Sequence, residues 1–243
     1  MTTLILGASA GIGRALARLL AAKGHRLVLV ARGADDLDAE ARHLRLVHGA
    51  QVEWLAADAA APAEILRILT GLRTGPPIRT LLFPIGLTHE LDDGLLPAAA
   101  LTALIDANLT SVMAVAGLFL PEMLASDVGN IVCFGSIAAI RGRGANIAYA
   151  AAKRGLESYF ESLRHRLAAT GVRVQFYRLG YVATQMSFGK ALRLPSASPE
   201  WIAEQVVRNL GRDVPLRHLP RFWAGIGALT KALPWRVYRR LQF

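Results

Sequence analysis

The chain has 243 residues, of which 53% are hydrophobic and 19% charged. This composition excludes a disordered or low-complexity protein, and the length is sufficient for one domain with a large buried core. The net charge of +10 favours an anionic partner, although aromatic and basic residues are not interleaved as in a nucleic-acid platform, so no nucleic acid is expected. The histidines lack paired ligand spacing, and no metal site is expected.

Strand and helix patterns alternate along the chain, which is typical of βαβ units. Strands are predicted at Thr3–Leu6, Arg26–Ala31, Gln51–Ala56, Thr80–Phe83, Gly129–Phe134 and Arg173–Leu179. Helices are predicted at Ile12–Lys23, Ala34–His48, Pro62–Arg73, Ala98–Leu124, Ala148–Thr170 and Pro199–Asn209. The pattern predicts an α/β fold, a single-domain Rossmann-type doubly wound parallel sheet over residues 1–243. A cofactor in such a fold lies at the carboxyl ends of the strands.

Two local patterns bear on location. The apolar stretch Val112–Leu120 is shorter than the ~20 residues that span a bilayer, which predicts a buried helix. The single cysteine, Cys133, lies in an apolar strand pattern and indicates a reducing compartment. No secretory signal is recognised before the first strand, so a cytoplasmic location is expected.

A glycine-rich turn follows the first predicted strand and opens the first helix. In Gly7-Ala8-Ser9-Ala10-Gly11-Ile12-Gly13, the glycines permit close backbone approach, and the helix start offers free N–H groups to a pyrophosphate. The spacing G-x-x-x-G-x-G differs from the commoner G-x-G-x-x-G, so the turn alone is weak evidence.

Ser136, Tyr149 and Lys153 form a set suited to proton transfer. The four-residue step from Tyr149 to Lys153 places both side chains on one helix face. An ammonium group beside the phenol would lower its pKa toward neutrality. Taken singly, such a serine is usually a helix cap, and such a Tyr–Lys pair is usually a solvated helix face.

Together these motifs resemble the short-chain dehydrogenase/reductase family over roughly residues 3 to 190. The resemblance implies an oxidoreductase, commonly a homo-oligomer, that transfers hydride between a nicotinamide and a carbonyl or secondary alcohol. It also implies that Asn108 completes a catalytic tetrad with Ser136, Tyr149 and Lys153 and supports a water-linked proton relay to the lysine. The predicted cofactor contacts are Gly7, Ser9, Gly11, Ile12, Gly13, Arg32, Asp58, Gly86, Tyr149, Lys153, Gly180, Val182 and Thr184.

The end of the second predicted strand favours NADP(H). An acidic residue there would bind the ribose 2′-hydroxyl of NAD, whereas this chain has Ala31 followed by Arg32, whose planar fork suits a 2′-phosphate. Arg14 either adds positive potential nearby or, in the favoured interpretation, is a solvated helix residue. Asp58 follows the third predicted strand, where the family places an aspartate near the adenine.

Two segments depart from the family pattern. Phe83-Pro84-Ile85-Gly86 replaces Asn-Asn-Ala-Gly, and Leu179-Gly180 replaces Pro-Gly. The first of these departures, together with Arg141–Asn146, Val182–Met186 and a basic tail, resembles the ketoreductase component of the decaprenylphosphoryl-ribose 2′-epimerase system. That resemblance implies reduction of a polyprenylphosphoryl 2-keto-pentofuranose to the arabinose epimer.

The segment 220–243 is basic and amphipathic. It is either a lid or packing element, with its arginines in water, or a contact with the inner face of an anionic membrane. Arg141 and Arg143 are either solvated loop residues or groups that face a substrate phosphate, and Asn146 either forms a turn or binds a sugar hydroxyl. Two further functions stay open: a ketoreductase for a soluble acyl, steroid or sugar carbonyl, and a non-catalytic NADP-binding or scaffold protein.

Overall fold

The computed structural model describes residues 1–185 and 194–241. Within them, seven strands form one sheet in the order β3-β2-β1-β4-β5-β6-β7, and every neighbouring pair is parallel. The doubly wound prediction is therefore confirmed, and the chain order reverses between β1 and β4. The strands are β1 (Thr2–Leu6), β2 (Arg26–Ala31), β3 (Val52–Ala56), β4 (Ile78–Phe83), β5 (Gly129–Ser136), β6 (Val172–Leu179) and β7 (Arg217–Leu219).

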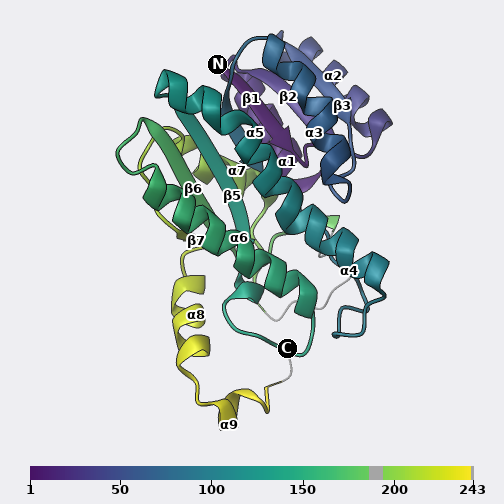
Figure 1. Ribbon diagram of the computed structural model, residues 1–243. Helices are drawn as coiled ribbons and strands as arrows, with labels where there is room; N and C mark the ends of the chain where they lie inside the picture. Colours follow the sequence, from purple (N-terminus) through teal and green to yellow (C-terminus); the bar gives the residue numbers. More distant parts are fainter. Residues whose placement is uncertain (186–193, 242–243) are drawn as a thin grey trace.

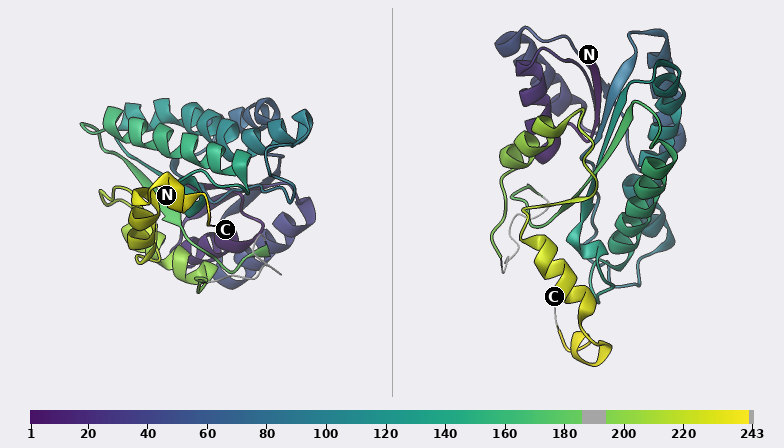
Figure 2. Two further views of the ribbon diagram at one scale, coloured as in Figure 1. Left: turned by 90° about the horizontal axis from the view of Figure 1, so that it is seen from below. Right: turned by 90° about the vertical axis from the view of Figure 1, so that its left-hand side faces the viewer.

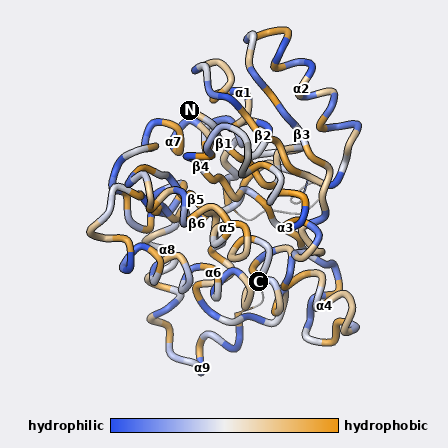
Figure 3. The backbone as a smooth tube through the Cα atoms, turned by 45° about the horizontal axis from the view of Figure 1, so that its top comes forward, coloured by the Kyte–Doolittle hydropathy of each residue, from blue (hydrophilic) through white to orange (hydrophobic). Residues whose placement is uncertain are grey.

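Helices cover both faces of the sheet (Figures 1 and 2). One face carries α1 (Gly11–Ala22), α2 (Ala34–His48) and α7 (Pro199–Asn209). The opposite face carries α3 (Pro62–Thr70), α4 (Ala98–Ile105), α5 (Ser111–Ser126) and α6 (Ile147–Arg166). Along α2, hydrophilic and hydrophobic residues alternate (Figure 3), and Leu37, Ala41 and Leu44 are the apolar residues that it buries.

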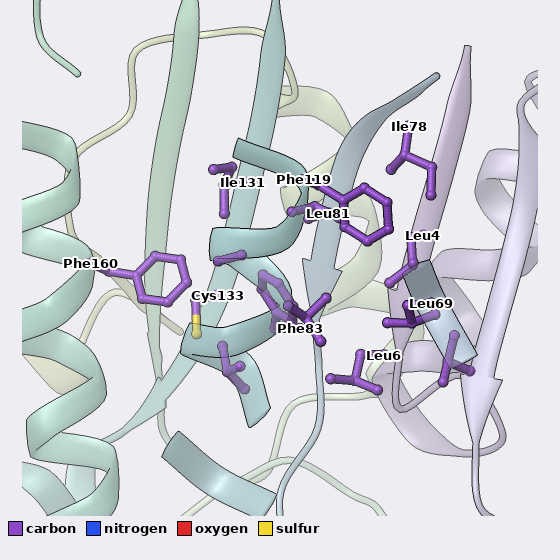
Figure 4. Close-up of a cluster of buried hydrophobic side chains, with 14 of the residues drawn as sticks. Leu4, Leu6, Leu69, Ile78, Leu81, Phe83, Phe119, Ile131, Cys133 and Phe160 are labelled. Atoms are coloured by element: carbon purple, nitrogen blue, oxygen red, sulfur yellow. The ribbon is translucent and has the colours of Figure 1, made fainter. Parts of the chain in front are cut away.

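The core on the α5–α6 face explains one departure from the family pattern (Figure 4). Phe83 at the end of β4 is fully buried and meets Phe160 of α6 edge to face, with ring centroids 6.2 Å apart. An apolar contact therefore occupies the place where the family carries an amide side chain. Cys133 is buried in the same cluster, as predicted, and burial raises its thiol pKa to about 12.

The long helix predicted over Ala98–Leu124 contains a local change of geometry. A π-helical segment, Asp106–Thr110, separates α4 from α5. Helix Ala98–Ser126 is long and apolar enough to cross a membrane by length and composition. Nevertheless, Val112, Val115 and Phe119 are fully buried against the sheet, which confirms the predicted buried helix.

The end of the chain contains elements that were not predicted. After β7, the chain forms α8 (Trp223–Ala232) and the short α9 (Trp235–Tyr238). Figures 1 and 2 show both helices projecting beyond one end of the layered body. Trp223 and Tyr238 are buried, whereas Leu229 and Trp235 are 66% and 65% exposed. The segment is thus fixed by two aromatic side chains and leaves other apolar side chains uncovered.

Candidate active site

One cleft of about 1030 Å³ connects the glycine turn with the proton-transfer residues. It lies where β1 and β4 are neighbours, at the carboxyl ends of the strands, as the fold predicts. Gly13 and Asn108 are the predicted site residues that do not line it. Those that do are Gly7, Ser9, Gly11, Ile12, Arg32, Asp58, Gly86, Ser136, Tyr149, Lys153, Gly180, Val182 and Thr184.

The glycine turn brings backbone close to backbone. A Cβ on Gly7 would lie 3.0 Å from the backbone of Ile85, and φ at Gly7 is +99°. A Cβ on Gly13 would lie 1.9 Å from the carbonyl oxygen of Gly7, so the absence of a side chain at Gly13 allows the start of α1 to pack against the turn. The first turn of α1 carries no acidic residue and no side-chain cap, which leaves its N–H groups available for an anion.

The charged groups near β2 and β3 line the other part of the cleft. Arg32 is exposed there. Arg14 donates to the carbonyl oxygen of Ser9 and lies 3.6 Å from a carboxylate oxygen of Glu40 and 4.0 Å from one of Asp36. Asp58 accepts a hydrogen bond from the amide of Ala60 at 2.9 Å. Arg14 is therefore tied to the glycine turn and to α2, and Arg32 is the arginine that lines the cleft at the end of β2.

Lys153 is held by backbone oxygens from two strands. Its ammonium group donates to the carbonyls of Ile85 at 3.0 Å and Phe134 at 3.2 Å, and the residue is 2% exposed. Burial lowers its pKa, which the nearby Cys133 offsets in part. The two acceptors fix the position of the ammonium group below the cleft.

Tyr149 and Ser136 meet above this lysine. The phenol hydrogen-bonds the Ser136 side chain, and the Lys153 nitrogen is 5.9 Å from the phenol ring centroid. Burial raises the pKa of Tyr149, while the Ser136 hydrogen bond and the charge of Arg143 lower it. The expected net lowering by Lys153 is therefore wrong for this structure, because burial prevails. The phenol therefore carries its proton at neutral pH, as an ordinary phenol does, and can donate it to a substrate oxygen on which negative charge develops.

Asn108 is fully buried beneath the cleft. Its amide nitrogen donates to the carbonyls of Leu87 at 2.7 Å and Leu104 at 2.9 Å, and its oxygen accepts from the amide of Leu87 at 3.2 Å. The π-helical segment places this residue one turn away from Leu104. The side chain thus fixes the loop after β4, and its part in a proton relay stays a prediction.

Sequence reasoning missed Asp92, which holds the first turn of the catalytic helix. Its carboxylate accepts from the amides of Ala148 and Tyr149, each at 2.9 Å, and the residue is 3% exposed. Asn146, the N-cap of α6, has φ of 54° and makes no side-chain cap. Because Asn is a residue type that commonly caps helices, the sequence alone carried no signal that this helix start needs an external acceptor.

We expect Asp92→Ala to lower the free energy of unfolding by about 1–2 kcal/mol, as for a lost helix cap. Because Tyr149 is then held less accurately, kcat should fall about 10- to 100-fold while NADPH affinity stays unchanged. Asp92→Asn retains one acceptor oxygen and should recover most of kcat. The control is Asp93→Ala, since the Asp93 carboxylate accepts a hydrogen bond from the amide of Leu95 in its own loop, at 3.0 Å, and not from the start of α6. Equal kcat in Asp92→Ala and wild type would contradict this positioning role.

Comparison with known proteins agrees with this geometry. Residues 1–192 match the family model described as short chain dehydrogenase. The chain belongs to the short-chain dehydrogenase/reductase family. It is 31% identical to an uncharacterized oxidoreductase of Mycobacterium tuberculosis, covering 98% of this chain and 95% of that one. Identity to the 3-oxoacyl-[acyl-carrier-protein] reductase of Escherichia coli is 30%, over 76% of this chain and 74% of the relative.

A solved relative within this family carries a nicotinamide cofactor. A short-chain dehydrogenase from Sphingobium yanoikuyae in complex with NADPH is 28% identical and superimposes with a TM-score of 0.83, covering 96% of each chain. The chain is thus an oxidoreductase of the short-chain dehydrogenase/reductase family. The likeness extends past residue 192 into the segment that contains β7, α8 and α9.

Gly180 allows α8 to pack closely against the active-site cleft. A Cβ on Gly180 would lie 1.8 Å from the indole nitrogen of Trp223, so glycine makes room for that side chain. Trp223 also meets Tyr181 edge to face, with centroids 5.2 Å apart. Gly180 was predicted as a cofactor contact, and in the structure it both lines the cleft and contacts α8. Met186, which belongs to one of the resemblance motifs, lies outside the described residues.

Proposed function

We propose that this short-chain dehydrogenase/reductase is an NADP(H)-dependent carbonyl reductase. The observation that carries the proposal is the single cleft that is lined by the glycine turn and Arg32 on one side and by Ser136, Tyr149 and Lys153 on the other. The turn fits a dinucleotide because a side chain at Gly7 or Gly13 would fill the space close to the backbone. The amides at the start of α1 would bind the pyrophosphate, and Arg32 the 2′-phosphate.

When bound, the reduced nicotinamide supplies hydride to the carbonyl carbon of the substrate. Ser136 donates a hydrogen bond to the carbonyl oxygen, which orients it toward Tyr149. Tyr149, whose phenol carries its proton at neutral pH, delivers that proton to the oxygen as negative charge develops. Lys153 holds the nicotinamide ribose from a position fixed by Ile85 and Phe134. Asn108 supports the relay that returns the proton by keeping the Leu87 loop in place.

The cofactor preference is tested by charge reversal at Arg32. We expect wild type to favour NADPH over NADH in kcat/KM, and Arg32→Glu to weaken use of NADPH about 10- to 100-fold, because charge-assisted hydrogen bonds to the phosphate are replaced by repulsion. Arg42→Glu makes the same charge change on α2, where Arg42 is exposed and pairs with Asp38. Use of NADH by wild type at least as efficient as use of NADPH would remove the Arg32 argument.

The substrate class is tested by following NADPH absorbance across acyl, steroid and sugar ketones. Reduction of at least one class supports the proposal. Tight NADPH binding with no oxidation on any carbonyl would instead support the non-catalytic NADP-binding alternative. The intact tetrad favours the enzyme.

A second candidate is reduction of a polyprenylphosphoryl keto-sugar by an enzyme at the inner face of a membrane. Residues 214–243 contain six Lys and Arg and no Asp or Glu. Leu229 and Trp235 are largely exposed among these cations. Apolar and aromatic side chains beside cations suit an anionic lipid interface, and the segment adjoins the site through Trp223 and Gly180.

We expect the protein to sediment with phosphatidylglycerol vesicles and much less with phosphatidylcholine vesicles. The double variant Leu229→Gln, Trp235→Gln should weaken binding at least about tenfold, because it removes apolar area from the interface. Leu46→Gln with Leu95→Gln changes two exposed leucines elsewhere and should have no effect. Absence of wild-type binding to anionic vesicles would exclude the membrane-contact candidate and leave the soluble carbonyl substrate.

A further inference from the structure

Two arginines of the loop between β5 and α6 have different surroundings. Arg141 donates to the carbonyl of Thr230 at 2.8 Å and to that of Leu233 at 2.5 Å, and its guanidinium carbon lies 4.0 Å from the Tyr238 ring centroid. Arg141 therefore ties α8 and α9 to the body, and the suggestion that it faces a substrate phosphate is not supported. Arg143 instead lines the cleft together with Ser136 and Tyr149.

Arg143 has hydrogen-bonding capacity left for a ligand. Its Nε donates to the carbonyl of Ala145 at 3.2 Å, which orients the guanidinium plane. Within residues 1–185 and 194–241, no carboxylate forms an ion pair with it. A partly buried guanidinium with free terminal amines can bind a carboxylate or phosphate through two parallel hydrogen bonds.

The remaining charges of the cleft do not compete for this arginine. The carboxylates among its described lining residues are Asp36 and Asp58, next to the ends of β2 and β3. Asp92, near Tyr149, is occupied by the amides at the start of α6. The charge of Arg143 also reaches the reacting phenol, because it lowers the pKa of Tyr149. The part of the cleft around Tyr149 thus carries an uncompensated positive charge at short range.

We propose that Arg143 binds an anionic group of the carbonyl substrate, so that this enzyme favours ketones that carry a carboxylate or a phosphate over neutral ketones. Asn146 lines the same part of the cleft and offers an amide to a neighbouring hydroxyl or oxyanion. The inference rests on the proposed carbonyl reductase activity and defines its substrate class. A keto acid, a phosphorylated ketose and a lipid-linked sugar phosphate share the required chemistry.

The test compares matched substrates that differ in charge. Wild type, Arg143→Gln and Arg143→Lys are assayed with a keto acid and its methyl ester, and with a ketose phosphate and the free ketose. We expect wild type to favour the charged member of at least one pair. Arg143→Gln should reduce that preference in kcat/KM about 10- to 100-fold, mainly through KM, and Arg143→Lys should retain part of it. The pair that responds identifies the anion as carboxylate or phosphate.

The ratio of kcat/KM for the charged substrate to kcat/KM for its neutral partner separates a direct contact of Arg143 with the substrate from an indirect effect of Arg143 on Tyr149. Because loss of Arg143 also raises the pKa of Tyr149, both members of a pair can slow together, and this common change cancels in the ratio. Arg154→Gln removes a charge from α6, the helix that carries Tyr149, at an exposed residue outside the cleft, and should leave the ratio unchanged. An equal loss on charged and neutral members, or a wild type that prefers the neutral members, would overturn the inference and leave the reductase function standing. A wild type that reduces no carbonyl would overturn the function itself, and the inference with it.

Discussion

Tyr149→Phe is expected to lower kcat about 1,000-fold, within the range of general acid catalysis, while NADPH binding is retained. The substitution removes the proton that the carbonyl oxygen requires and leaves the aromatic ring in place. Neither Lys153 nor Ser136 replaces the phenol, because the lysine is directed at two backbone carbonyls and an aliphatic hydroxyl is a much weaker acid than a phenol. Steady-state rates and cofactor titration by fluorescence measure the two effects separately.

The matched control is Tyr159→Phe. Tyr159 lies on the same helix as Tyr149, its hydroxyl is partly buried, and it does not line the cleft. This variant should keep wild-type turnover. Substantial turnover by Tyr149→Phe, or an equal loss in both variants, would reject Tyr149 as the proton donor.

Gly13→Ala is also expected to cause a large loss of activity, because it disrupts the glycine turn and so prevents NADPH binding. The new Cβ would lie 1.9 Å from the carbonyl oxygen of Gly7 and 3.0 Å from the Cα of Ala8, both backbone atoms that cannot rotate away. The turn must therefore open, at a cost of at least about 1–3 kcal/mol as for overpacking. We expect a lower urea midpoint and a loss of most NADPH binding, measured by chemical denaturation and by titration calorimetry.

Gly225→Ala provides the comparison for Gly13→Ala. Gly225 lies in α8, and an added Cβ meets nothing within 4 Å. Replacing a helical glycine by alanine stabilises by about 0.5–1 kcal/mol where there is space. Unfolding and NADPH binding should therefore be unchanged or slightly improved. If Gly13→Ala behaved like Gly225→Ala, the turn would not be the tight backbone contact described above.

The sequence predicted the fold well where the signal is local. The apolar run in β2 and the glycine turn before α1 are recognisable without tertiary information. In contrast, β7 has only three residues and exists through its pairing with Tyr177–Leu179 of β6. Such a strand has no pattern of its own. The π-helical segment around Asn108 likewise depends on contacts with Leu87, 21 positions away.

The sequence predicted the residues of the site but not the direction in which the pKa of Tyr149 is shifted. Motif spacing located Ser136, Tyr149 and Lys153, because residues four apart share a helix face. Spacing carries no information about burial, and burial decides the direction of the Tyr149 pKa. Asp92 was missed because it acts on a helix start 57 positions later. The different roles of Arg141 and Arg143 were also not predictable, because they depend on where α8 and α9 pack.

The central claim is that the glycine turn and Tyr149 serve one hydride transfer in one cleft. The most direct test is a single turnover with NADPH deuterated at nicotinamide C4 and a carbonyl substrate, followed by mass spectrometry of the product. We expect one deuterium on the former carbonyl carbon, delivered from one face of the nicotinamide, and almost none in the same time with Tyr149→Phe. An alcohol product without deuterium, or NADPH binding with no transfer to any carbonyl, would contradict the claim.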